Sequence, residues 1–198
     1  MMVEDNAIVL DFMPRGKGSS FKPEPLAQVL GTSHFTLLEV VPKEGVELKA
    51  FDSVYIGKEE RDKIDHIKRR INFKDLTSNS VAEIEKAIEK IIREQEQKFV
   101  EFFNNAQPIS IKRHKLELLP GLGKKHLMSI LSEREKEPFT SFKDIQARVH
   151  LMPDTVKTIA KRVTEELEGG GDKHFIFARP PAQEHDDFRP RREFSRGE

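Results

Sequence analysis

The apolar residues of this chain change their spacing at about residue 77. Before that point they form short runs rich in β-branched residues, separated by Gly, Pro and Ser. After it they recur at steps of three and four residues over residues 80–104. Short runs divided by turn residues are typical of strands, and steps of three and four are typical of an amphipathic helix. The sequence therefore predicts an α+β fold with a β part followed by an α part.

The β part is predicted to be a small barrel over residues 1–76. We expect strands over residues 7–12, 35–41, 46–49, 53–56 and 64–73, and one helical turn over residues 24–30. Residues 64–73 fit both helical spacing and strand alternation, and we favour the strand. Many short strands with turn signals between them are typical of a compact barrel or sandwich, and periodicity does not say which.

The α part is predicted to contain a linking helix over residues 77–107 and a helical domain over residues 108–168. The helical domain begins with a short helix that ends near Leu118, a turn at Pro120-Gly121 and a helix that starts near Gly123. The pattern helix, turn, helix then repeats, with its turn near Met152-Pro153. A further strand over residues 172–179 follows a run of three Gly residues, and we expect it to return to the barrel as an edge strand. Residues 180–198 are predicted to form a disordered tail.

Charge and composition exclude several classes of protein. Lys and Arg number 34 and Asp and Glu number 34, so the formal net charge is zero and nucleic-acid binding must rest on local charge. The absence of Cys excludes disulfides, Cys-ligated zinc, iron–sulfur clusters and thiol nucleophiles. The His spacing predicts no metal site, and nothing predicts a cofactor. No apolar run approaches the ~20 residues of a membrane span, so we expect a cytoplasmic protein without membrane contact.

The most basic segment also contains a glycine motif. Within residues 110–127 the basic residues are Lys112, Arg113, Lys115, Lys124 and Lys125, against one acidic residue. The motif Leu119-Pro120-Gly121-Leu122-Gly123-Lys124 resembles the hairpin of the helix-hairpin-helix family. Residues 150–154 resemble a degenerate second copy, so the resemblance implies a tandem helix-hairpin-helix domain.

The two glycines of the motif suit contact with phosphate. Gly permits positive φ and has no Cβ to block an approaching ligand. The first amides of the next helix are unpaired donors at the positive end of its dipole. The resemblance assigns the phosphate-facing amides to Gly121, Gly123 and Lys125. In the degenerate copy we expect Asp154 to act as an N-cap, which repels phosphate, so that copy is predicted to be structural.

The whole chain resembles the DUF655 family of archaeal predicted nucleic-acid-binding proteins. The resemblance lies in residues 35–45, 54–58, 68–71 and the hairpin, and it covers residues 5–181. It implies that the barrel is OB-like. We therefore expect a non-catalytic nucleic-acid-binding protein that contacts the phosphate backbone. RNA is the first choice of ligand because of the resemblance, and duplex DNA is the alternative.

Two further functions compete with this prediction. A protein–protein adaptor in a translation or transcription complex would suit the neutral net charge, and ribosomal or transcription components are possible partners. Some DNA glycosylases carry a catalytic Lys two places after the second Gly, where Lys125 stands, but their supporting Asp is displaced here to Asp144. We therefore predict no enzymatic activity. On the barrel, Lys68 and Arg70 are predicted either to add phosphate contacts or to lie on a solvated strand face.

Overall fold

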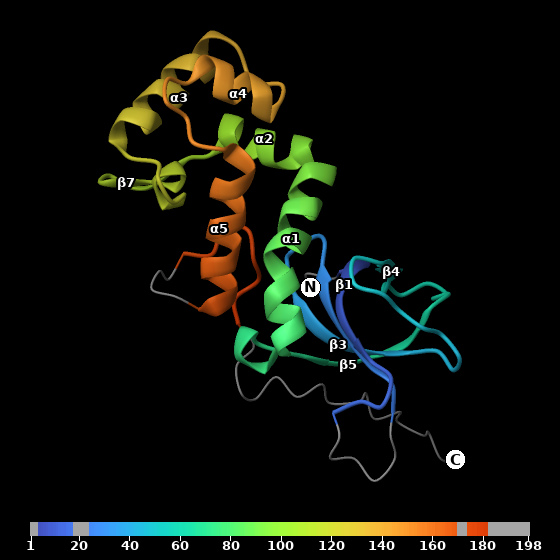
Figure 1. Cartoon of the computed structure of the whole chain (residues 1–198). Coiled ribbons are helices and arrows are strands. Elements are labelled where there is room, and N and C mark those ends of the chain that lie inside the picture. Colours follow the sequence, from blue (N-terminus) through green and yellow to red (C-terminus); the bar gives the residue numbers. More distant parts are fainter. Residues whose placement is uncertain (1–3, 18–23, 170–173, 182–198) are drawn as a thin grey trace, which may run out of the picture.

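The computed structural model describes residues 4–17, 24–169 and 174–181. Within these residues the fold is α+β, as predicted. The main sheet contains β1 (Asn6–Met13), β2 (Leu26–Gly31), β3 (Leu37–Pro42), β4 (Ser53–Tyr55) and β5 (Ile64–Arg70). The α-helices are α1 (Ser78–Glu94), α2 (Glu96–Asn105), α3 (Lys124–Lys136), α4 (Phe142–Arg148) and α5 (Thr155–Glu168). The sheet lies at one end of the molecule and α3 and α4 lie at the other, with α1 and α5 between them (Figure 1).

The five strands of the main sheet form a curled, open half-barrel. Their order is β4-β1-β2-β3-β5, and all neighbouring strands are antiparallel. A bulge in β1 shifts the register between Val9 and Asp11. Such a bulge sets two residues opposite one and re-aims the side chains that follow it. After the bulge, the Asp11 carboxylate accepts a hydrogen bond from Thr77 Oγ1 at 2.7 Å, which ties β1 to the start of α1.

Both faces of the central strands are buried. Along β2, Ala27 and Val29 pack inside the half-barrel, whereas Leu30 packs toward the helices. Gln28 also faces α1, where its Oε1 accepts hydrogen bonds from Thr77 N at 2.9 Å and Ser80 Oγ at 2.8 Å. Every residue of β2 and β3 is buried. These two strands therefore offer no open face to a ligand.

The helix expected over residues 80–104 is interrupted at Gln95. This residue has φ −114° and ψ 32°, and its side chain donates to the Thr32 carbonyl at 3.0 Å. The interruption separates α1 from α2, which leaves at an angle (Figure 1) and buries Phe99 and Phe103. Both helices keep the 3.6-residue period, so periodicity alone does not reveal the change of direction.

A small β-hairpin and three helices follow α2. The hairpin, which the sequence did not predict, pairs β6 (Pro108–Ser110) with β7 (Arg113–His114). The short helix expected to end near Leu118 is a 3₁₀ helix, η2 (Lys115–Leu118). The start of α3 at Lys124 confirms the expected start near Gly123. Helices α4 and α5 confirm the second helix-turn-helix pattern. A further 3₁₀ helix, η1 (Phe73–Asp75), precedes α1.

Two expectations for the β part are wrong. Residues 26–30 belong to strand β2 instead of a helical turn, because both of their faces are buried between β1 and β3. Residues 46–49 form no strand. There, Val46 N donates to Lys43 O at 3.1 Å, and the Asp52 carboxylate accepts from Lys49 N at 3.0 Å. Turns that use the backbone amides in this way compete with a strand ladder.

The edge strand expected over residues 172–179 is wrong over its described part, residues 174–179. The buried carboxylate of Glu166 in α5 accepts hydrogen bonds from the N–H groups of Ile176, Phe177 and Ala178 at 2.8, 3.0 and 2.7 Å. Those amides are therefore not available to a strand ladder. The segment still reaches the half-barrel, where Arg179 N donates to the β2–β3 loop. Residues 172–173, and 182–198 of the expected tail, lie outside the described residues.

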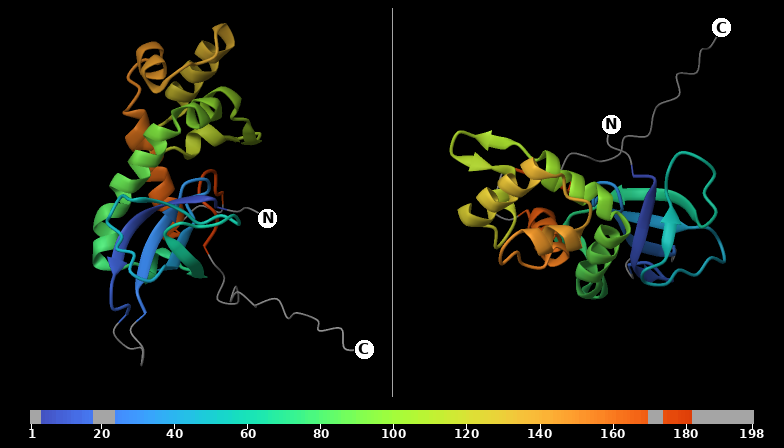
Figure 2. Two further views of the ribbon diagram at one scale, coloured as in Figure 1. Left: turned by 90° about the vertical axis from the view of Figure 1, so that its right-hand side faces the viewer. Right: turned by 90° about the horizontal axis from the view of Figure 1, so that it is seen from above.

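One hydrophobic core runs from the sheet to the far helices. It includes Leu30 of β2, Ile88 of α1, Val163 of α5, and Leu119 and Leu122 beyond η2. In the left view of Figure 2, the molecule is elongated along the direction of α1 and α5. Because the packing is continuous, the far helical end is held in a fixed position relative to the sheet.

Candidate functional site

The first hairpin, defined as residues 119–123, connects η2 to α3. Leu119 and Leu122 are buried, whereas Gly121 and Gly123 are exposed. The N–H of Leu122 donates to the carbonyl of Leu119 at 3.1 Å and closes the turn. Gly121 has φ +83°, a left-handed conformation that is costly for other residues. The leucines thus anchor the loop in the core, and the glycines form its outer surface.

Helix α3 begins without a side-chain cap. Gly123 occupies the N-cap position with φ −92° and ψ −178°, and the first turn holds no acidic residue. A Cβ added to Gly123 would meet no atom within 4 Å, so the approach to the helix start is open. The first amides of an α-helix have no partner within the helix and carry the positive end of its dipole. This helix start is therefore suited to an anion such as a phosphate group.

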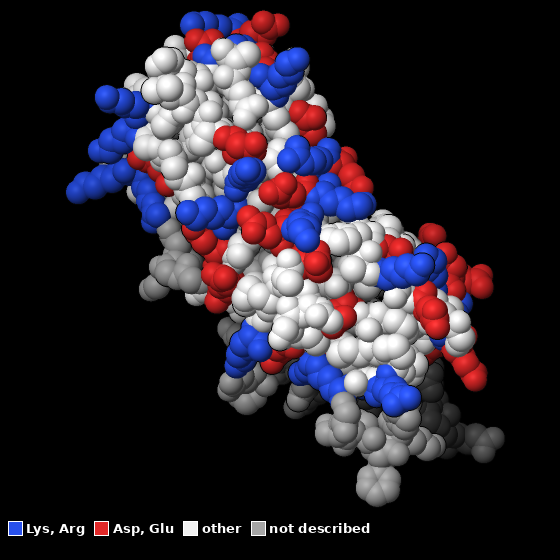
Figure 3. All heavy atoms as spheres, in the orientation of Figure 1, with Lys and Arg blue, Asp and Glu red and all other residues white. Residues whose placement is uncertain are grey.

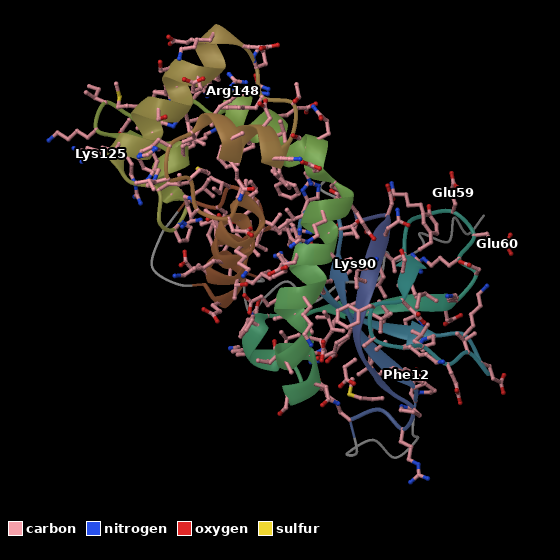
Figure 4. All side chains as sticks on the ribbon, turned by 45° about the horizontal axis from the view of Figure 1, so that its top comes forward. Phe12, Glu59, Glu60, Lys90, Lys125 and Arg148 are labelled. Atoms are coloured by element: carbon pink, nitrogen blue, oxygen red, sulfur yellow. The ribbon has the colours of Figure 1, made fainter. Side chains whose placement is uncertain are left out.

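Exposed basic side chains surround this helix start. Lys124 and Lys125 open α3, and Figure 4 shows Lys125 projecting away from the helix. Lys112, Arg113 and Lys115, from the β6–β7 hairpin and η2, are also exposed. In Figure 3, Lys and Arg side chains gather along the edge of the molecule where α3 begins. The structure thus brings the predicted basic residues of segment 110–127 to one end.

A groove separates the β6–β7 hairpin from α3. On the hairpin side it is lined by Ile111, Lys112 and Arg113, and on the helix side by Lys124 and Met128. Basic and apolar side chains therefore share the same surface next to the first hairpin. Sequence analysis missed Ile111 and Met128, although an isolated Ile beside Lys and Arg in a polar loop is a visible signal.

The two predicted barrel residues lie elsewhere. Lys68 of β5 forms an exposed ion pair with Glu24 at 2.7 Å. Arg70 is partly buried and donates to the carbonyls of Arg179 and Pro180 in the C-terminal segment. The structure does not bring these residues together with the first hairpin, because β5 lies at the opposite end of the molecule (Figure 1).

The second hairpin, residues 149–154, lies beside the first. His126 Nε2 is 3.1 Å from the Leu151 carbonyl oxygen, and a Cβ on Gly121 would lie 3.9 Å from Pro153. As expected, Asp154 is the N-cap of α5, where its carboxylate accepts from Lys157 N at 2.9 Å. The second hairpin therefore places a carboxylate where the first leaves its amides open.

The entry to the first hairpin depends on His114. Its Nδ1 accepts a hydrogen bond from Leu116 N at 3.1 Å, and the backbone N–H of His114 donates to the Glu117 carboxylate at 2.7 Å. Burial, followed by the nearby charge of Arg134, lowers the pKa of the His114 imidazole below its ordinary value. A neutral imidazole is required because a protonated Nδ1 cannot accept a hydrogen bond. The start of η2 is therefore built around neutral His114.

The buried carboxylates of the sheet region all have structural partners. Glu39 accepts from Arg69 Nε at 2.7 Å and contacts Lys17 Nζ at 2.6 Å. Burial opposes the charge of Glu39, but the hydrogen bonds from Arg69 and Lys17 outweigh it and lower its pKa. Glu4 accepts from three backbone amides of the β2–β3 loop at 2.8–3.1 Å. Paired in this way, the carboxylates hold the fold and face no groove at the helical end.

The described residues lack two features, a membrane-spanning helix and a cluster of metal-ligating side chains. Within them, no helix is long and apolar enough to cross a membrane. The same part of the chain contains no group of three or more His, Asp or Glu side chains placed to hold a metal ion.

Comparisons with known proteins agree with one another. The family model described as protein of unknown function (DUF655) matches residues 3–179. The uncharacterized protein MJ0038 of Methanocaldococcus jannaschii is 42% identical over 178 residues, which cover 89% of this chain and 80% of the relative. The crystal structure of Af1531 from Archaeoglobus fulgidus superposes with a TM-score of 0.82 at 45% identity, over 89% of this chain and all of that one. The chain therefore belongs to the DUF655 family.

Proposed function

We propose that this protein is a non-catalytic nucleic-acid-binding protein that holds the phosphate backbone at the first hairpin. In this proposal the paired hairpins act as a tandem helix-hairpin-helix module on an OB-like half-barrel. The observation that carries the proposal is the uncapped start of α3, where Gly123 leaves the first amides open and Lys124 and Lys125 follow at once. RNA is the first ligand to test, and duplex DNA is the second.

The sheet is less suited to binding nucleic acid than the helical end, which supports the choice of the first hairpin. Binding of single strands usually needs aromatic side chains on which bases can stack. Strands β2 and β3 are buried on both faces, and the rings of Phe35 and Phe177 both pack against the buried ring of Phe99. The described part of the sheet is thus better suited to supporting the helical end than to reading bases. Phosphate contacts of this kind position a protein but carry little sequence information.

The site argues for binding over catalysis. A glycosylase would need an Asp to assist Lys125, and Asp144 stands one place beyond the position at which those enzymes carry it. Its carboxylate instead accepts from Thr140 N at 3.0 Å and pairs with Arg148 Nη1 at 3.2 Å. Asp144 therefore serves the start of α4 and its ion pair. We infer that Lys125 contributes charge to a phosphate contact.

The proposal is tested by binding of fluorescent duplex RNA and duplex DNA at several salt concentrations. We expect wild-type affinity to fall as salt rises, with a log–log slope of about −0.9 per phosphate contact on B-DNA. The double variant Lys124→Gln/Lys125→Gln should bind more weakly and with a shallower slope. The matched control Lys49→Gln/Lys58→Gln removes two exposed lysines of the sheet region and should leave both quantities unchanged.

Two results would overturn the proposal. The first is the absence of binding to either duplex. The second is equal loss of affinity in the two double variants, which would show that binding depends on the overall charge of the protein and not on the first hairpin. Salt-independent capture of a protein component of the translation or transcription machinery, lost in the Lys124/Lys125 variant, would favour the adaptor function instead.

A further inference from the structure

The tip of the β6–β7 hairpin is an apolar side chain with almost no contact in the protein. Ile111 has a relative exposure of 105%. Across the groove, Met128 of α3 is 65% exposed. Single exposed apolar residues are ordinary on protein surfaces. Two that line one groove among basic residues are more specific, and they suggest a surface that is covered in a complex.

The tip is held in a fixed position relative to the first hairpin. Pairing of Ser110 with Arg113 closes the turn that carries Ile111. At the base of the turn, Lys115 N donates to Gln107 O at 3.3 Å, and His114 is buried. The four residues of η2 then lead directly to the first hairpin. A ligand held at the start of α3 would therefore meet the Ile111 side chain at a defined place.

The chemistry of the groove points to a ligand with both negative charge and flat apolar surfaces. Lys112 and Arg113 directly follow Ile111, and Lys124 lies across the groove from it, so the basic residues in the lining outnumber its acidic residue, Glu117. A purely apolar partner gains nothing from these charges. In nucleic acids, phosphates and base faces lie a few ångströms apart, and proteins insert Ile, Leu or Met between base steps from positions fixed by phosphate contacts.

We propose that Ile111 is a wedge that enters the base stack of a double helix at a bulge, while the first hairpin holds the neighbouring phosphates. This inference rests on the proposed function and adds to it a preference for interrupted duplexes. Unstacking costs least where the stack is already broken. Bulged duplexes should therefore bind more tightly than continuous ones, without any base being read by hydrogen bonds.

The test uses an RNA duplex with 2-aminopurine beside a single-nucleotide bulge, and the same duplex without the bulge. We expect wild type to raise the 2-aminopurine fluorescence and to prefer the bulged duplex by about threefold or more, because insertion separates the fluorescent base from its neighbour. Ile111→Ser should lose both effects yet bind the continuous duplex within about twofold of wild type. Ile111→Leu should retain both. The matched control Val81→Ser, at an exposed apolar residue of α1, should behave as wild type.

The outcomes separate the wedge from the proposed function. If wild type binds both duplexes equally and leaves the fluorescence unchanged, the wedge is wrong and the phosphate site stands. If wild type binds neither RNA duplex, the wedge is wrong, and the proposed function fails as well only if duplex DNA is not bound either. If wild type sediments as a dimer and Ile111→Ser as a monomer, the groove is a contact between two copies of this chain and the wedge is wrong.

Discussion

The two hairpins of the helical end connect similar elements, but their second helices begin in different ways. At α5, Asp154 accepts a hydrogen bond from its own first turn at 2.9 Å, whereas at α3, Gly123 has no side chain to do so. A helix start that satisfies its own amides is complete without a ligand. One that leaves them exposed keeps donors and partial positive charge for an anion. Of the two neighbouring hairpins, only the first has this chemistry.

The hairpins also share a feature that makes the difference clearer. Each turns through a left-handed residue, Gly121 with φ +83° and Leu151 with φ +54°. A non-glycine residue in this conformation costs of order 1–3 kcal/mol. The second hairpin thus keeps the same turn although the left-handed backbone of Leu151 is strained. Helix α5, which follows this turn, buries side chains from Thr155 to Leu167. On the proposed function, the second hairpin therefore serves packing and the first hairpin contacts the ligand.

The largest expected effect comes from giving the first hairpin the cap of the second. Gly123 already has N-cap backbone angles and room for a Cβ, so Gly123→Asp should fold normally and cap α3. Its carboxylate would occupy the amides and repel phosphate, and we expect duplex affinity to fall by about tenfold or more. Affinity measured by fluorescence anisotropy, together with the Tm, checks this prediction.

A neutral cap provides the control for that experiment. Gly123→Asn can occupy the same amides without adding a negative charge, so its affinity should lie between wild type and Gly123→Asp. Unchanged affinity in both variants, at unchanged or higher Tm, would show that the start of α3 is not the phosphate site.

The converse change should affect stability and leave binding unaltered. Asp154→Ala removes the cap of α5, and we expect a loss of about 1 kcal/mol in the free energy of unfolding. Because α5 lies within the shared core, the loss should appear in the single unfolding transition measured with urea. A change in duplex affinity larger than that of Lys125→Ala would contradict the assignment of the second hairpin to packing.

The two hairpins should also differ in their response to pH. The lowered pKa of His114 means that the folded state favours the neutral form, so its stabilising contribution is present above the ordinary pKa and is lost as pH falls through the folded value. Arg134, Glu117 and Lys115 are the charged groups that act on it. Ser141, which caps α4, the helix that leads into the second hairpin, does not titrate.

Urea unfolding at pH 7.5 and 5.5 tests this difference. Wild type should lose more stability between these pH values than His114→Asn, which can cap η2 through its amide without taking up a proton. The other histidines are present in both proteins and cancel in the comparison. Identical pH dependence in the two proteins would show that His114 does not control the entry to the first hairpin.

The smallest expected effect is that of Lys125→Ala. An exposed lysine that only attracts phosphate should cost less than about fivefold in affinity. Its loss should reduce the magnitude of the salt slope by about one. Wild type should form no borohydride-trapped adduct with a duplex containing an abasic site. A Lys125-dependent adduct would instead identify an enzyme with a catalytic amine.

The sequence predicted local structure well wherever one residue type determines the geometry. The Pro-Gly turn and the glycine motif predicted the start of α3 near Gly123, and the preference of Asp for helix starts predicted the cap of α5. The position of Arg70 was not predictable, because its partners are carbonyls more than 100 residues later in the chain. The break at Gln95 likewise depends on a contact with the distant Thr32. Contacts made at long sequence separation leave no local pattern.

The hydrogen bonds from the amides of residues 176–178 to Glu166 of α5 affect how the chain folds. Ala178 is buried in the core that also contains Ile8, and Arg179 N donates to His34 O at 2.9 Å. Contacts between the two ends of a chain raise its contact order and slow folding. During synthesis, the sheet leaves the ribosome long before residue 178, so the part of the sheet region that residues 176–179 contact stays uncovered until those residues have been made. A circular permutant in which residues 176–179 are made close in time to the sheet would pack these residues against the sheet region sooner.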